Sequence, residues 1–100
     1  MSAVDPALLE RLRQRRAELA SRLDDAMRRA QESKARYEEL EELLDRDGTQ
    51  ELAEHLRRMR QQALAENSVA VEEIRNLMAR LQVHEELLAV LEGRSTDGAQ

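Results

Sequence analysis

A seven-residue repeat of apolar and small side chains constrains this sequence more than any other feature. The repeat runs from position 52 to position 91 in two rows that are offset by three residues. Two such rows form one seam along a long α-helix. The sequence therefore predicts a helix that packs along this seam against another helix. The rows hold Leu56, Ala63, Ala70, Leu77 and Leu91, and Ala53, Ile74, Leu81 and Leu88.

The first half of the chain carries a matching pair of rows. Arg16 interrupts one of them, and small residues occupy the middle of the face, where they allow a partner helix to come close. Asp5 and Pro6 predict the start of this helix, because Asp caps free N–H groups and Pro fits the first helical position. The rows hold Leu9, Leu23, Ala30, Tyr37 and Leu44, and Leu12, Leu19, Ala26, Ser33 and Leu40.

Gly48 lies in the strongest break between the two seams. Glycine suits the residue after a helix end, and a short connection makes two helices antiparallel neighbours. We therefore expect one domain over residues 1–100, with helices at about 6–46 and 50–92, a turn at 47–49 and a flexible tail at 93–100. The expected fold is all-α, a long antiparallel helical hairpin (coiled coil) that dimerisation completes into a four-helix bundle. The expected register places Ala30 near Ala63 and Ala65.

Asn67 places a polar side chain on the seam of the second helix. Asn67 and Ser68 compete for backbone hydrogen bonds, so this stretch is the weakest of the helix. Two outcomes are open: a continuous helix in which a buried Asn67 fixes register or partner number, or a kink or break at this point. We favour the continuous helix.

The composition argues against an enzyme and against a metal or cofactor site. The chain has one Tyr, no other aromatic residue and no Cys. Neither histidine has the glutamate three residues earlier that a di-iron bundle needs, since Leu52 precedes His55 and Leu81 precedes His84. His84 and Glu85 begin a zinc-protease motif, but Leu88 stands where the second histidine belongs. We expect a helix-end or interfacial role for His84, with Glu85, Glu86 or the other helix as its partner.

The charge pattern argues against nucleic acid and membrane partners. The net charge is −5, and no apolar run approaches the roughly 20 residues of a membrane span. Residues 1–6 lack the basic region and apolar run of a signal peptide, so we expect a cytoplasmic protein. Because a helical hairpin offers no concave pocket, we also expect no small-molecule substrate. One row of arginines repeats every seven residues, and it either binds an anionic partner or pairs with glutamates across the seam. We favour the second interpretation for this row, which holds Arg15, Arg22, Arg29 and Arg36.

Beyond Ser68, the apolar face of the second helix is broader than one neighbouring helix can cover. Either the chain dimerises through this face or the face receives a helix of another protein. The residues expected to contact a partner are Val71, Ile74, Leu77, Met78, Leu81 and Leu88.

The second half also resembles the flagellar (type III) export chaperones of the FlgN and FliT kind. The matching features are Glu66-Asn67-Ser68-Val69, then Ile74, Leu77, Leu81, Leu88 and Leu91, and finally Ser95-Thr96-Asp97-Gly98. The resemblance implies a cytoplasmic secretion chaperone that holds an amphipathic helix of its substrate. The alternatives are a structural coiled-coil module whose only role is dimerisation, and a nucleic-acid-associated protein that uses the arginine row.

Overall fold

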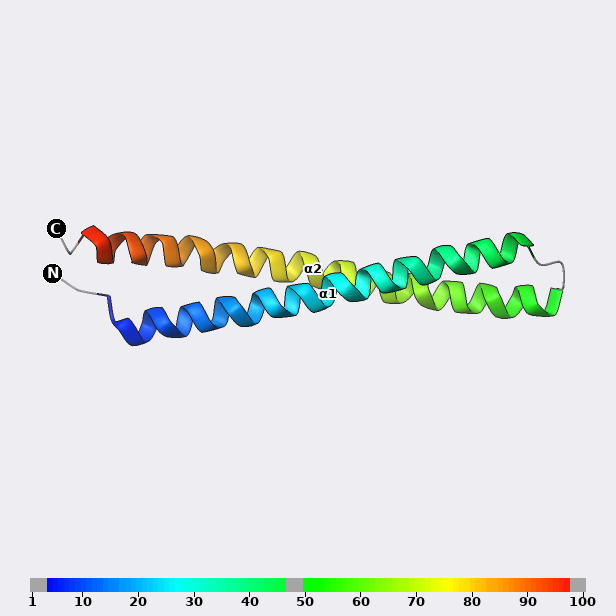
Figure 1. The fold of residues 1–100 in the computed structure, drawn as a ribbon, viewed down its shortest axis with the longest axis horizontal. Coiled ribbons are helices and arrows are strands. Elements are labelled where there is room, and N and C mark those ends of the chain that lie inside the picture. Colours follow the sequence, from blue (N-terminus) through cyan, green and yellow to red (C-terminus); the bar gives the residue numbers. More distant parts are fainter. Residues whose placement is uncertain (1–3, 47–49, 98–100) are drawn as a thin grey trace. The chain divides into compact units, whose positions relative to one another are not determined.

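The computed structural model describes residues 4–46 and 50–97, which form two long helices (Figure 1). Helix α1 spans Pro6–Arg46 and helix α2 spans Gln50–Asp97. No strand occurs within these two ranges. The prediction of an all-α fold is confirmed, and the prediction of a turn at 47–49 concerns residues outside the described ranges.

The start of α1 follows from Asp5. The Oδ1 atom of Asp5 accepts a hydrogen bond from the backbone N–H of Ala7 at 2.9 Å. The carbonyl oxygen of Asp5 accepts the backbone N–H of Leu9 at 3.1 Å, which closes the first turn. These two contacts satisfy donors that the start of a helix otherwise leaves free, so the predicted start of α1 is confirmed.

Helix α2 differs from the prediction at its end. It continues to Asp97, whereas we expected it to end at about residue 92 with a flexible tail from Gly93. Gly93 has no positive φ, so it does not adopt the left-handed conformation that ends many helices. Glycine inside a helix costs about 1 kcal/mol relative to alanine, which weakens a helix without ending it. The remaining tail residues, 98–100, lie outside the described ranges.

Helix α2 passes through Asn67 and Ser68 without a break, as favoured from the sequence. Both helices run through two compact units of the chain. Unit 1 combines Met1–Leu23 with Arg75–Gln100, and unit 2 spans Asp24–Ile74. Each unit therefore contains one segment of α1 and one segment of α2.

The helix segments of unit 2 are antiparallel. Arg29 of α1 pairs with Glu73 of α2, Arg36 pairs with Glu66, and Glu41 pairs with Arg60. The partners on α2 move back along the sequence as those on α1 move forward, which is the pattern of a helical hairpin. In unit 1, the two segments are joined by an ion pair between Arg13 and Glu92, at 3.2 Å.

The buried residues of both units belong to the predicted seam. Unit 1 buries Leu9, Leu19, Leu77 and Leu88, and unit 2 buries Ala26, Ser33, Leu40, Leu56, Ala63 and Ala70. In unit 2, Leu40, Leu56 and Ala63 pack together, and Tyr37, Leu44 and Met59 pack against them. The seven-residue repeat therefore predicted which side chains form the core.

In unit 2, Tyr37 packs in one cluster with Leu56 and Met59, as a register counted from the turn predicts, but Ala30 lies about one helical turn along α2 from its expected partners. We expected Ala30 near Ala63 and Ala65, but the Ala30 carbonyl accepts a hydrogen bond from Asn67. The expectation counted the register from the turn, and small residues at matching heights supported it. The side chain of Asn67 instead lies where it finds two hydrogen-bond acceptors, because an unpaired polar group in a helix interface is costly.

Candidate functional site

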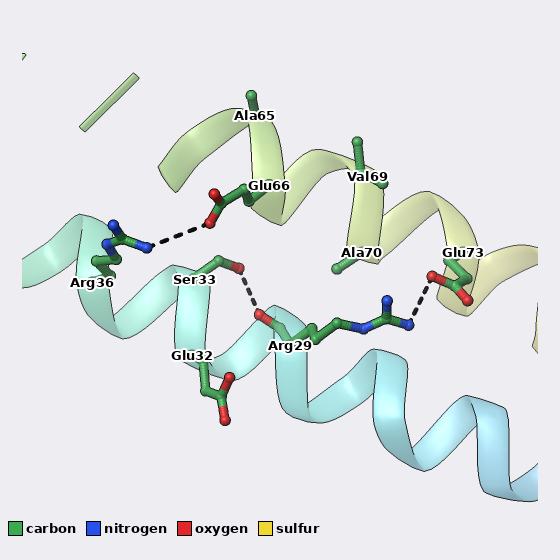
Figure 2. Close-up of a pocket in the computed structure, with 9 residues that line it drawn as sticks. All are labelled: Arg29, Glu32, Ser33, Arg36, Ala65, Glu66, Val69, Ala70 and Glu73. Carbon is green, nitrogen blue, oxygen red and sulfur yellow. Dashed lines mark hydrogen bonds and ion pairs between the residues drawn. The ribbon is translucent and has the colours of Figure 1, made fainter. Parts of the chain in front are cut away.

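In unit 2, a groove with a volume of about 470 Å³ lies between α1 and α2. Figure 2 shows its lining residues on both helices. The groove exists because the side chains that line it at the seam are small. Ser33 and Ala70 are both buried there, and neither is large enough to fill the space between the helices. The lining residues are Arg29, Glu32, Ser33 and Arg36 from α1, and Ala65, Glu66, Val69, Ala70 and Glu73 from α2.

Two ion pairs connect the helices along this groove (Figure 2). The Nη2 atom of Arg29 lies 2.9 Å from Oε2 of Glu73, and Nη1 of Arg36 lies 3.7 Å from Oε2 of Glu66. These four side chains remain 32–54% exposed to solvent, so each pair contributes at most about 1 kcal/mol to stability. The arginine row thus supplies contacts across the seam at two positions, while Arg15 pairs with Glu18 of its own helix.

A polar contact lies in the seam beside the groove. The Nδ2 atom of Asn67 donates to the carbonyl oxygen of Ala30 at 2.9 Å and to Oγ of Ser33 at 3.1 Å. Ser33 Oγ donates in turn to the Arg29 carbonyl at 2.8 Å, as Figure 2 shows. No buried side-chain N or O atom among the described residues lacks a hydrogen-bond partner. This contact joins α1 to α2 at one defined register.

The six predicted partner-binding residues have different environments. Leu77 and Leu88 are fully buried in unit 1, and Leu81 is half-buried there. Ile74 is half-buried in unit 2. Val71 in unit 2 and Met78 in unit 1 are exposed. Leu77 and Leu88 therefore lie in the interior of unit 1, and Met78 is the exposed member of the set in that unit.

Three exposed aliphatic residues of α2 in unit 1 were not among those six. Val83, Leu87 and Val90 are 60%, 43% and 52% exposed. Their spacing of four and then three residues places them on one side of the helix. The sequence shows the spacing of these three residues. It does not show which apolar residues of α2 are covered by α1 and which stay exposed.

His84 has a different hydrogen-bond partner from the glutamates that we expected. Nδ1 of His84 lies 3.1 Å from the carbonyl oxygen of Arg80, so its partner is the backbone of its own helix and not Glu85 or Glu86. Within residues 4–46 and 50–97, no group of three or more His, Cys, Asp and Glu side chains is arranged to hold a metal ion. Over the same residues, neither helix has a stretch that is long and apolar enough to cross a membrane.

The pKa of Tyr37 is raised, chiefly because its hydroxyl forms a hydrogen bond with Glu41. Burial and the negative charge of Glu41 raise it further, whereas the positive charge of Arg60 lowers it. Tyr37 is the single tyrosine and the chain has no Trp, so phenolate absorbance reports on it alone. We expect its titration midpoint to lie above 10.0 and to fall toward that value in Glu41→Gln. A Glu42→Gln control, whose glutamate pairs with Arg46, should leave the midpoint unchanged.

The sign of the linked stability follows from the direction of this shift. The folded state holds the phenol proton more tightly than the unfolded chain does. The hydrogen bond to Glu41 therefore stabilises the fold below the ordinary tyrosine pKa, and this contribution is lost as the pH rises through the raised value. Equal midpoints in the wild type and Glu41→Gln would contradict this assignment.

Comparison with known proteins does not assign a family. The chain matches no family model, no curated protein and no solved structure. The likeness to flagellar export chaperones therefore stays a prediction from the sequence.

Proposed function

We propose that this protein is a non-enzymatic interaction module that binds an amphipathic helix of another protein. The observation that supports this function is the exposed row of Val83, Leu87 and Val90 on α2. Aliphatic side chains spaced by four and three residues match the anchor spacing of a helix laid alongside. Glu86 follows Val83 by three residues and accepts a hydrogen bond from Gln82, so the row has a polar border.

The energetics favour a partner of modest affinity. Burial of an aliphatic side chain is worth about 1.5–3 kcal/mol when it is complete, and these three side chains are already partly covered. Three such contacts supply at most about 9 kcal/mol before the cost of association is subtracted, so this row supports weak, reversible binding rather than a permanent complex. A cytoplasmic chaperone that holds and then releases an export substrate, as the sequence resemblance implies, needs affinity of this kind.

The test uses a synthetic helical peptide with leucine at positions i, i+3, i+4 and i+7 and glutamine and alanine elsewhere. Without net charge, such a peptide does not bind through electrostatic attraction alone. We expect fluorescence anisotropy to show saturable binding that weakens at least tenfold in Leu87→Glu. Leu64→Glu is the matched control, because Leu64 is also 43% exposed on α2 but lies in unit 2. Equal binding by the two variants, or no binding at all, would contradict the proposal.

A structural dimerisation module is the second candidate. It is favoured by the small number of large side chains that unit 2 buries, since Leu40 and Leu56 are its buried leucines among the described residues. In that case, the melting temperature rises with protein concentration in the absence of any ligand.

A further inference from the structure

The groove of unit 2 lies between two edges of opposite charge. On α1, the edge carries Arg29 and Arg36, seven residues apart, and on α2 it carries Glu66 and Glu73, also seven residues apart. Between the edges, the lining is small or aliphatic, and Val69 is the most exposed of the large hydrophobic side chains described, at 69%. The face thus presents a basic row, an apolar centre and an acidic row.

The same two edges continue toward the end of unit 2 with apolar side chains. Leu43 follows Arg36 by seven residues on α1, and Leu52 precedes Glu66 by fourteen on α2; both are exposed. Residues seven apart lie on the same side of a helix in a hairpin of this kind. The face therefore has exposed leucines beyond its charged rows.

Unit 2 buries little by itself. Its buried positions are three alanines, one serine and two leucines, a small apolar core for a segment of this length. Domains with too small a core commonly gain the missing burial by association. The face beside the groove is where unit 2 exposes Val69, Leu43 and Leu52.

We propose that this face binds the same face of a second copy of the chain. The argument for a second copy is the charge pattern, because a face with one basic and one acidic row is complementary to itself. A two-fold axis parallel to the helices brings α1 of one copy over α2 of the other. Each arginine of the basic row then meets the acidic row of the second copy, and the Val69 side chains enter the interface.

The opposite arrangement is disfavoured by charge. An axis perpendicular to the helices places α1 over α1, so arginine meets arginine. Burial of charged groups is also costly unless each retains a partner, and the first arrangement gives every arginine a second carboxylate. This interface uses residues other than Val83, Leu87 and Val90, so it stands or falls independently of the proposed function.

The first experiment measures the mass in solution by light scattering from micromolar to near-millimolar protein. We expect the wild type to reach twice its chain mass of 11.5 kDa. Val69→Arg should remain monomeric at concentrations at least tenfold above the wild-type midpoint, because it places charge at the centre of the interface. Leu64→Arg is the matched control. Leu64 lies on α2 two residues before Glu66, and therefore on the side of α2 that faces away from Glu66. This variant should dimerise like the wild type.

The second experiment tests complementarity with two double variants. Arg29→Glu/Arg36→Glu makes both rows acidic, and Glu66→Arg/Glu73→Arg makes both rows basic. Each should be monomeric alone, and an equimolar mixture should form a heterodimer, with circular dichroism confirming that each remains helical. A wild type that stays monomeric, equal dimerisation of Val69→Arg and Leu64→Arg, or a mixture that does not associate would overturn the proposal. The Val69→Arg variant should still bind the leucine-containing helical peptide, because Val69 is not part of the row formed by Val83, Leu87 and Val90. Loss of dimerisation with retained peptide binding therefore concerns this interface and not the proposed function.

Discussion

Replacement of Leu77 by alanine is expected to lower the free energy of unfolding by about 2–4 kcal/mol. Leu77 is 1% exposed and packs in the seam of unit 1. The substitution removes the burial of three carbon atoms and leaves a cavity that a two-helix interface fills only in part. Since whole domains are stable by about 5–15 kcal/mol, the loss is a large fraction of the total. Urea denaturation followed by circular dichroism measures it.

The neighbouring residue provides the control for this substitution. Met78 is 56% exposed, and we expect Met78→Ala to change stability by less than about 1 kcal/mol. Both proteins are compared at one concentration, because association would shift the apparent stability. Similar losses in the two variants would mean that α1 does not cover Leu77, and the assignment of the seam in unit 1 would be wrong.

Substitution of Asn67 by aspartate is expected to cost about 2 kcal/mol or more at neutral pH. Aspartate has nearly the shape of asparagine, but an ionised carboxylate has no N–H to donate. The contact to the Ala30 carbonyl would place acceptor against acceptor in a half-buried position, and the Ser33 hydroxyl could donate to the carboxylate only by turning away from its own backbone acceptors. The whole loss therefore comes from charge and hydrogen bonding rather than from packing.

Acid should reverse this loss. Protonation of the new carboxyl restores a donor, so the variant is expected to approach the stability of the wild type as the pH falls toward 4. Asn76→Asp makes the same chemical change at an exposed position of α2 and should have little effect at any pH. If Asn67→Asp and Asn76→Asp are equally stable at pH 7, the Asn67 contact does not hold the two helices together.

The sequence predicted the core because its apolar rows repeat with one period over the whole length of both helices. Every buried residue described lies in one of the four predicted rows, including Ser33, whose small polar side chain would not suggest burial outside the pattern. The start of α1 was also predictable, since Asp5 and Pro6 act on adjacent backbone groups. Local chemistry and periodicity were sufficient for these features.

The register and the end of α2 were less predictable, for different reasons. Counting the position of Ala30 from the turn ignored the directional requirement of Asn67, whose amide needs acceptors at set distances. Gly93 was expected to end the helix, but the signal depends on a backbone conformation that the residue permits without requiring. The partner residues were uncertain because Leu77 and Met78 are equally apolar, and only the course of α1 decides which of them is covered.

Both the start of α1 and the end of α2 belong to unit 1, and this arrangement determines how the hairpin responds to tension. A load applied between the first and last residues pulls the two helices apart at the Arg13–Glu92 pair, so the contacts separate one after another. Such peeling requires far less force than sliding two helices past each other, where many contacts must rupture together. The hydrogen bonds of Asn67 would then register as a pause midway through the extension trace.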